Sequence, residues 1–246
     1  MTLHKGDYEE VLKEIKANLI LTSPPYNIGS RSPRIDGQRK FGKFDPKSFG
    51  AIRDYPDNIP EDTYQKQQIK FLCWAADHLL ENGILVYNHK PRRKNGCLIH
   101  PAGWFSTTPV KKKLILADEI IWDRGSTHNH GRGIMWPQTE RLYVFYRRGD
   151  KYCLNNTSEL PQRSDIWRIN KGGNRAHCAP FPLELAKAVI MAWSKPSDLV
   201  LDPYMGSGTT GIAARMLGRN FAGAERLKKY YDLANSEING VLELAA

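Results

Sequence analysis

The stretch TSPPY at residues 22–26 places a hydroxyl, two prolines and an aromatic ring in succession, directly after an apolar run. Adjacent prolines usually mark a turn that ends a strand. Pro24 and Pro25 also fix φ and lack N–H groups, so the carbonyl of Pro24 would be held rigidly with no competing donor beside it. Ser23 Oγ and that carbonyl could accept hydrogen bonds from an amine, and Tyr26 could stack on a flat ring. We therefore predict that this turn holds a ring carrying an amine.

A second stretch, LVLDPYMGSGTTGIAARMLGRNFAGAE at 199–225, has the order strand, acid, Gly-rich turn, helix, strand and acid. Gly206 and Gly208 would let the backbone approach a ligand closely, and the following helix offers unpaired N–H groups at its N-terminus. Asp202 ends the first strand, at the crevice where such sheets bind ligands, and Glu225 ends the second, where an acid is the usual partner for ribose hydroxyls. No lysine follows the glycines, so the loop is not a Walker A motif, but GSGTTG fits G-x-G-x-x-G and leaves a dinucleotide site open.

The elements that must position these stretches alternate between β-rich runs and helical patterns, which predicts an α/β sheet with helices on its faces. The expected strands are 19–22, 84–87, 118–122, 141–146, 198–202 and 220–225. The expected helices are 62–83, 181–198, 208–220 and 227–244. Residues 27–61 and 123–140 interrupt the alternation; long connections of this kind are usually functional or disordered, and we favour a functional role for both.

The composition is that of one globular domain, with 246 residues, 41% hydrophobic and 25% charged. No apolar stretch approaches the roughly 20 residues that span a bilayer, and the first thirty residues contain no apolar core of a signal peptide. The four cysteines are scattered without a C-x-x-C pair, which predicts reduced thiols and a cytoplasmic protein without a metal site. His128 and His130 lie in a Gly-rich loop without a third ligand, so we expect no metal there either.

The net charge of +10 is unevenly distributed. Residues 31–53 hold seven bases and two acids, a net charge of +5, and a second basic cluster, HKPRRKNG, occupies 89–96. Bases that alternate with Gly, Pro and Ser in loops suit a surface that follows a polyanion, so we predict binding to nucleic acid. The candidate DNA-contacting residues are Arg31, Arg34, Arg39, Lys40, Lys43, Arg92 and Arg93.

TSPPY and DPYMGSGTT together resemble the S-adenosylmethionine-dependent DNA amino-methyltransferases, which combine a catalytic [DNS]-P-P-[YFW] motif with an F-x-G-x-G-like cofactor motif. Tyr204 stands where the family usually has Phe. The catalytic motif comes first in this chain, an order similar to the family's β group and unlike the protein and RNA amide methyltransferases with N-P-P-Y. The resemblance implies a Rossmann-like class I methyltransferase fold with a mostly parallel seven-stranded sheet. It implies one domain over 1–246, with basic DNA-contacting insertions at about 28–61 and 123–140.

Further segments carry the resemblance and what it implies for the cofactor, S-adenosyl-L-methionine. HKGDYEEVL (4–12) resembles the family's motif III, with Asp7 on the adenine side, and FAGAE places Glu225 on the ribose. LLENGILVYN (79–88) is similar to motif V. SDIWRINKGGNRAHCAPFPLELAKAVI (164–190) is similar to motif X, at the methionine end. The implied cofactor-binding residues are Asp7, His177, Phe181, Asp202, Tyr204, Gly206, Ser207, Gly208, Thr209 and Glu225.

The resemblance also implies catalytic roles for Ser23, Pro24, Pro25 and Tyr26 on a base flipped out of DNA. S-P-P-Y is typical of the cytosine-N4 enzymes, and D-P-P-Y or N-P-P-Y of the adenine-N6 enzymes, so we favour cytosine N4 and keep adenine N6 as the alternative. A restriction-modification role and a homodimer are compatible with the sequence.

Several alternatives stay open from the residues themselves. Asp7 could be the N-cap of a helix starting near Tyr8, and His177 could be an ordinary core or surface histidine. Trp122, Trp136 and Trp167 suit core or rim positions better than base stacking. A non-catalytic nucleic-acid-binding protein on a degenerate methyltransferase fold is a rival function, although the intact SPPY argues against decay. A nicotinamide-dependent oxidoreductase is another rival, but it would have no use for SPPY.

Overall fold

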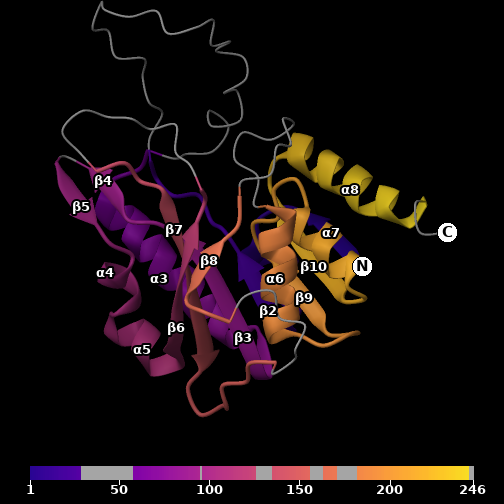
Figure 1. Ribbon diagram of the computed structural model, residues 1–246, viewed down its shortest axis with the longest axis horizontal. Coiled ribbons are helices and arrows are strands. Elements are labelled where there is room, and N and C mark those ends of the chain that lie inside the picture. The colour runs from indigo at the N-terminus through magenta and orange to yellow at the C-terminus, as the bar shows by residue number, and fades with distance from the viewer. Residues whose placement is uncertain (29–57, 95, 126–134, 156–162, 171–181, 244–246) are drawn as a thin grey trace, which may run out of the picture.

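The computed structural model describes residues 1–28, 58–94, 96–125, 135–155, 163–170 and 182–243 (Figure 1). An eight-stranded sheet runs through the molecule in the order β1-β10-β9-β2-β3-β7-β6-β8. In this order the strands are β1 (Thr2–Lys5), β10 (Asn220–Glu225), β9 (Leu199–Asp202), β2 (Ala17–Thr22), β3 (Leu79–His89), β7 (Thr139–Arg147), β6 (Leu114–Asp123) and β8 (Ile166–Arg168). The first five strands are mutually parallel, β7 is antiparallel to both of its neighbours, and β8 is parallel to β6.

Helices cover both faces of this sheet (Figure 1). One face packs against α1 (Tyr8–Val11), α3 (Glu61–Asp77), α4 (Ala102–Phe105) and α5 (Thr108–Lys113). The other packs against α6 (Leu183–Trp193), α7 (Thr209–Met216) and α8 (Lys228–Glu243). A small hairpin of β4 (Arg92–Lys94) and β5 (Cys97–Ile99) follows β3.

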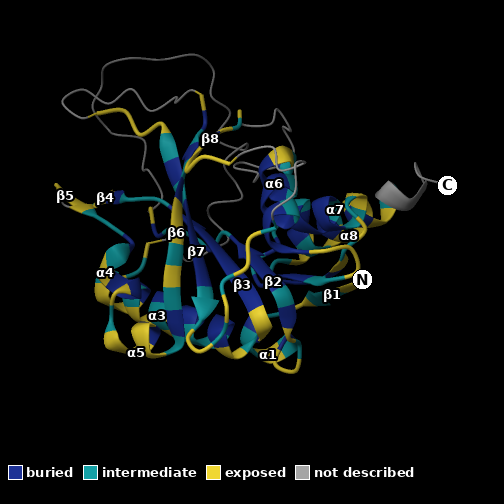
Figure 2. Ribbon diagram, turned by 60° about the horizontal axis from the view of Figure 1, so that its bottom comes forward, coloured by how far each residue is buried: buried dark blue, intermediate teal, exposed yellow. Residues whose placement is uncertain are grey.

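Strand β2 shows why the middle of a central strand is apolar. Side chains alternate between the faces of a strand. Leu19 and Leu21 accordingly join the core under α6 and α7, and Ile20 joins the core under α3. All three are at most 1% exposed. Both faces are covered, so a central parallel strand has no solvent side to carry polar residues (Figure 2).

The α/β sheet with helices on both faces is confirmed, and some details differ from the expectation. The sheet has eight strands where seven were expected. The short strands β1 and β8, the β4–β5 hairpin and the short helices α1, α4 and α5 were not predicted individually. No helix among the described residues is long and apolar enough to cross a membrane.

The helix predicted over 62–83 is wrong at its C-terminal end. It ends at Asp77, and Leu79 already begins β3, where it pairs with Ala17 of β2. Asn82 has φ 59°, and a Cβ on Gly83 would lie 3.0–3.1 Å from three backbone carbonyl oxygens. The Asn-Gly pair therefore marks an irregular, closely approached part of the strand and not the end of a helix.

Candidate active site

The sequence-predicted motifs meet at one edge of the sheet. TSPPY follows the carboxyl end of β2, and the Gly-rich turn follows the carboxyl end of the adjacent strand β9. Asn88 and His89 end β3, while β7, being antiparallel, begins at the same edge with Thr139 and Glu140. Because carboxyl ends of parallel strands share an edge, segments far apart in the chain lie together there.

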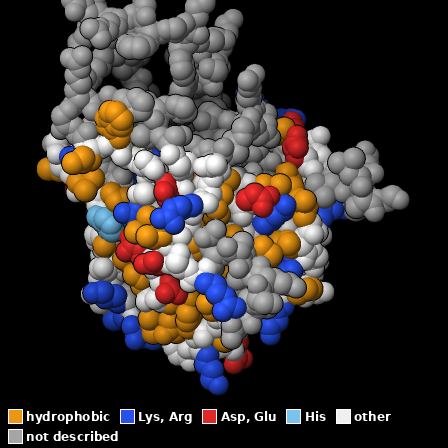
Figure 3. Space-filling model, viewed as in Figure 1, with side chains coloured by type: hydrophobic (Ala, Val, Ile, Leu, Met, Phe, Trp, Pro, Cys, Tyr) orange, Lys and Arg blue, Asp and Glu red, His pale blue; other side chains and the backbone are white. Residues whose placement is uncertain are grey.

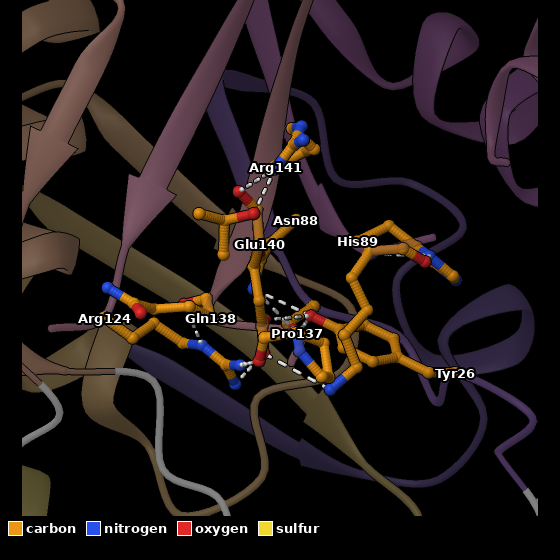
Figure 4. A network of polar contacts seen from close by, with 11 residues as sticks. Tyr26, Asn88, His89, Arg124, Pro137, Gln138, Glu140 and Arg141 are labelled. Carbon is orange, nitrogen blue, oxygen red and sulfur yellow. Dashed lines mark hydrogen bonds and ion pairs between the residues drawn. The ribbon is translucent and has the colours of Figure 1, made fainter. Parts of the chain in front are cut away.

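A hydrogen-bonded network surrounds Tyr26 (Figure 4) and includes Ser23. The Tyr26 hydroxyl lies 2.9 Å from Ser23 Oγ and 3.0 Å from Glu140 Oε2. Asn88 Nδ2 donates to the Tyr26 hydroxyl oxygen over 2.8 Å and approaches Ser23 Oγ at 3.3 Å. Burial, with the Glu140 carboxylate beside it, raises the pKa of the Tyr26 hydroxyl well above its usual value, so this hydroxyl keeps its proton.

Glu140 is the charged centre of this network. Its Oε1 atom lies 2.9 Å from Arg124 Nη1 and 3.5 Å from Lys90 Nζ. Arg124 also donates to the carbonyls of Pro137 at 2.6 Å and Gln138 at 3.0 Å. Glu140 and Arg124 are both buried. Arg124 and Glu140 lie near the two ends of the predicted DNA-contacting insertion 123–140. Their side chains therefore point into the protein, at the edge of the sheet that carries TSPPY.

A second chain of contacts fixes Pro25 from the other side. The Tyr64 hydroxyl donates to the Pro25 carbonyl at 2.8 Å and lies 2.7 Å from His89 Nε2. His89 Nδ1 accepts from the Lys90 backbone N–H at 2.8 Å. Burial, together with the charges of nearby bases, holds the pKa of His89 well below its usual value. The imidazole is therefore neutral, and its Nδ1 atom also lies 2.9 Å from the Lys90 carbonyl oxygen.

Tyr26 packs its ring against His89, with the ring centroids 4.5 Å apart, and Lys90 Nζ lies 5.3 Å from the Tyr26 ring centroid. The predicted stacking of Tyr26 on a base stays a prediction. Among the described residues no hydrogen bond reaches the Pro24 carbonyl, whereas Pro25 O is occupied by Tyr64. The roles of Ser23 Oγ and Pro24 O as acceptors for an amine stay a prediction.

Arg92, predicted to contact DNA, is buried, and this assignment is wrong. Its guanidinium binds both carboxylate oxygens of Glu61, at 2.8 and 3.2 Å, and lies 4.5 Å from the Tyr64 ring centroid. Arg93, the next residue, is exposed. The basic cluster at 89–96 sits on a strand end and hairpin, where successive side chains point in opposite directions.

The other candidate DNA contacts, Arg31, Arg34, Arg39, Lys40 and Lys43, lie outside the described residues, as do His128 and His130. The absence of a metal at those histidines stays a prediction. Among described residues on the face shown in Figure 3, Lys and Arg side chains are interspersed with Asp and Glu. That described part therefore carries no continuous basic patch.

Asp202 organises the Gly-rich turn from beneath. It is 4% exposed, and its carboxylate accepts from Thr22 Oγ1 at 3.0 Å, Thr210 Oγ1 at 2.7 Å and the Tyr204 N–H at 3.1 Å. Burial raises the pKa of Asp202 to about 6 despite these three donors. The carboxylate thus supports the turn through three protein donors, and its predicted contact with the cofactor stays a prediction.

The Gly-rich turn lies between β9 and α7. Gly208 has φ +87°, and a Cβ there would lie 3.0 Å from Ala234 Cβ and 2.9 Å from Ile238 Cδ1 of α8. Only glycine combines this left-handed conformation with such close packing. Ser207 and Thr209 are half-buried in the turn and at the first residue of α7, so their contact with a cofactor stays a prediction.

A cleft of about 250 Å³ joins the two motifs. Its lining includes Asp7, Tyr204 and Glu225 from the predicted cofactor set, and Pro25 from the catalytic motif. Glu225 accepts from the backbone N–H groups of Gly206 at 3.1 Å and Leu227 at 2.8 Å. Each carboxylate oxygen has a second lone pair, so Glu225 is able to accept from ribose hydroxyls as well.

Asp7 has two roles that the sequence presented as alternatives. It is the N-cap of α1, where Oδ1 accepts from the Glu9 N–H at 3.1 Å, and it also lines the cleft. His177 and Phe181 lie outside the described residues, so their predicted position at the methionine end is not described. Trp122 and Trp167 are buried core residues, as expected, and Trp136 is exposed.

Sequence reasoning missed four side chains that hold the site. Thr210 lies inside the Gly-rich motif, and Asn88 lies inside the stretch that resembles motif V, so a signal was present for both. Tyr64 and Glu140 had none, because a tyrosine in a helix and a glutamate in a strand have no distinctive spacing.

Comparisons with known proteins agree with this geometry. The putative DNA modification methylase TTHA0409 from Thermus thermophilus, solved in complex with S-adenosyl-L-methionine, is 25% identical to this chain, with a TM-score of 0.65 over 97% of this chain and 93% of that one. The type II methyltransferase M.MthZI of Methanothermobacter thermautotrophicus is 27% identical over 95% of this chain and 74% of its own length. M.HinfI of Haemophilus influenzae is 46% identical, but the match spans 51% of this chain and 40% of M.HinfI.

Fold and site together define a class I methyltransferase, with a cleft and the TSPPY turn at one edge of an α/β sheet. The family model described as DNA methylase (N6_N4_Mtase) matches residues 17–236, and the chain belongs to this family of DNA methyltransferases.

Proposed function

We propose that this protein transfers a methyl group from S-adenosyl-L-methionine to the exocyclic N4 amine of cytosine in DNA. The observation that carries the proposal is that Pro25, directly after the acceptors Ser23 Oγ and the Pro24 carbonyl, lines a cleft together with Asp7, Tyr204 and Glu225. The choice of cytosine rests on serine at the first position of S-P-P-Y. Adenine N6 is the alternative, because serine is able to accept from either amine.

The cleft residues fit the proposed cofactor. Glu225 supplies carboxylate lone pairs for ribose hydroxyls, and Gly208 allows a tight turn that a side chain would obstruct. When bound, S-adenosyl-L-methionine supplies an electrophilic methyl group on a sulfonium centre. Pro25, which lines the same cleft, ties the acceptor motif to this site.

The residues of the chain act on the amine. Its nitrogen lone pair is delocalised into the base, so the amine is a poor nucleophile. Hydrogen bonds from the amine to Ser23 Oγ and Pro24 O favour a tetrahedral nitrogen whose lone pair is free to attack. The base must leave the duplex to reach these acceptors, and positioning then supplies most of the rate.

Nucleoside mass spectrometry of DNA methylated by the purified protein tests this proposal. We expect N4-methylcytosine. N6-methyladenine without N4-methylcytosine would replace the proposed base, and neither product would overturn the activity. A Ser23→Ala variant should lose about 100-fold in kcat while keeping its affinity for the cofactor, because it removes an acceptor used in the transition state.

A further inference from the structure

The hydrogen bonds of Tyr26 can be satisfied in only one direction. A phenol has one hydrogen, and Tyr26 has three close polar neighbours: Glu140 Oε2 at 3.0 Å, Ser23 Oγ at 2.9 Å and Asn88 Nδ2 at 2.8 Å. A carboxylate only accepts and an amide NH2 only donates. The Tyr26 hydrogen therefore points at Glu140, and the Ser23 hydroxyl must donate to the Tyr26 oxygen.

Glu140 is fixed as the final acceptor in this series of hydrogen bonds from Ser23 through Tyr26. Arg124 Nη1 and Lys90 Nζ face its Oε1 atom, at 2.9 and 3.5 Å, so Oε2 is left for the Tyr26 hydroxyl. Arg124 is itself held by two backbone carbonyls and is 7% exposed. Asn88 presents its NH2 group to Tyr26 and Ser23, which is the amide orientation that a neighbouring carboxylate favours (Figure 4).

This direction matters for Ser23. A serine hydroxyl rotates freely, and it is able either to accept from an amine hydrogen or to donate to the amine nitrogen. Donation would occupy the nitrogen lone pair that methyl transfer requires. With its hydrogen committed to Tyr26, Ser23 Oγ presents lone pairs to a bound amine.

We propose that Glu140 is a positioning residue that acts through Tyr26 to keep the Ser23 hydroxyl turned as an acceptor toward the target amine. This inference rests on the proposed amine methylation. Glu140 touches neither cofactor nor base in this scheme, and it sets the direction of the hydrogen bonds from inside the sheet edge.

A Glu140→Gln substitution reverses the direction of the hydrogen bonds that link residue 140, Tyr26 and Ser23. Arg124 only donates, so the new amide oxygen takes the position facing Arg124, and the amide NH2 faces Tyr26. The Tyr26 hydrogen then turns to Ser23 Oγ, and the Ser23 hydrogen turns toward the amine. We expect kcat to fall about 10- to 100-fold, with KM for S-adenosyl-L-methionine and for DNA changed less than about twofold. Calorimetric affinity for the cofactor should be unchanged.

A double-mutant cycle with Tyr26→Phe separates this role from a structural one. Tyr26→Phe removes the hydroxyl that links Glu140 to Ser23 and leaves the Glu140–Arg124 pair intact. We therefore expect a loss in kcat similar to that of Glu140→Gln. The double variant should be no slower than Tyr26→Phe alone. Glu119→Gln is the matched control. Glu119 is an exposed carboxylate of β6, paired with Arg141 at 3.2 Å, and its replacement should leave kcat unchanged.

The outcomes are distinct. Full activity of Glu140→Gln, losses that multiply in the double variant, or a defect confined to KM or thermal stability would each overturn the positioning role. If Glu140→Gln fails to fold, Tyr26→Phe decides alone, because unchanged kcat there would exclude any route from Glu140 to Ser23. Absence of amine methylation by the wild-type protein would instead reject the proposed function and the inference with it.

Discussion

Asp202 should make the folded protein less stable as the pH rises from about 4 to about 7, and Asp202→Asn should remove this dependence. The side chain is 4% exposed and accepts three hydrogen bonds, from Thr22, Thr210 and the Tyr204 N–H. Hydrogen bonds to a carboxylate lower its pKa and burial raises it. Burial dominates here and raises the pKa of Asp202 to about 6, from an ordinary value of 3.8.

The sign and size of the effect follow from that difference. Between pH 4 and pH 6 the folded protein binds more protons at this site than the unfolded chain, so the free energy of unfolding falls as the pH rises. The two pKa values differ by about 2, and one pKa unit corresponds to about 1.4 kcal/mol. Full ionisation of Asp202 therefore lowers the free energy of unfolding by about 3 kcal/mol.

Urea unfolding at several pH values from 4 to 8, on wild type and Asp202→Asn, isolates this group and its coupling to the Glu225 carboxylate, because the titrations of uncoupled groups cancel in the difference. Asn keeps one oxygen for Thr22 and the Tyr204 N–H, and its NH2 donates to Thr210, whose hydroxyl is able to accept. We expect the stability of the variant relative to wild type to rise by about 2–3 kcal/mol from pH 4 to pH 7. Asp232→Asn, which removes an exposed carboxylate of α8, gives the background.

A difference that is independent of pH would refute the dominance of burial at Asp202. A difference of opposite sign would show that the three donors stabilise the carboxylate more than burial destabilises it.

Arg92→Ala should lower the free energy of unfolding by about 3 kcal/mol or more, because it leaves the Glu61 carboxylate without its buried partner, while Arg93→Ala should change it by less than about 0.5 kcal/mol. Equal effects in urea unfolding would contradict the burial of Arg92. Gly208→Ala should destabilise by about 2–4 kcal/mol, from left-handed strain and from overpacking against α8, and should weaken cofactor binding. Gly218 also has a positive φ but open space around it, so Gly218→Ala should show the destabilisation from left-handed backbone strain alone. Thermal unfolding of the two variants measures the difference in their stability.

The fold could be predicted where apolar runs were long or strongly patterned. β2, β9 and β10 are buried on both faces, and their runs gave boundaries within two residues of the structure. The errors came where a local signal has two meanings. Asn82-Gly83 resembles a helix C-cap, yet it lies in a strand that begins at Leu79, because pairing with Ala17 overrides the helical pattern. The four-residue strand β1 is too short for a pattern and is defined by its pairing with β10.

The site could be predicted only for residues whose chemistry is marked in the sequence. The prolines of SPPY and the glycines of the turn restrict the backbone in recognisable ways, and they led to the cleft. Arg92 was misassigned because the count of bases in a cluster does not show which side chain points inward. Glu140 was missed because its contact with Tyr26 depends on the antiparallel pairing of β7 with β3, which places it beside a residue 114 positions earlier.

The buried bond between Thr22 and Asp202 explains why the order of the motifs along the chain is immaterial to the site. Thr22 immediately precedes Ser23, Asp202 immediately precedes the Gly-rich turn, and the two side chains are 180 residues apart in sequence but 3.0 Å apart in space. Strands β2 and β9 are parallel neighbours, so each presents its carboxyl end to the same edge. Lateral strand pairing, and not chain connectivity, therefore sets the distance between the acceptor motif and the cofactor cleft, and a permuted chain that keeps this pairing keeps the geometry for transfer.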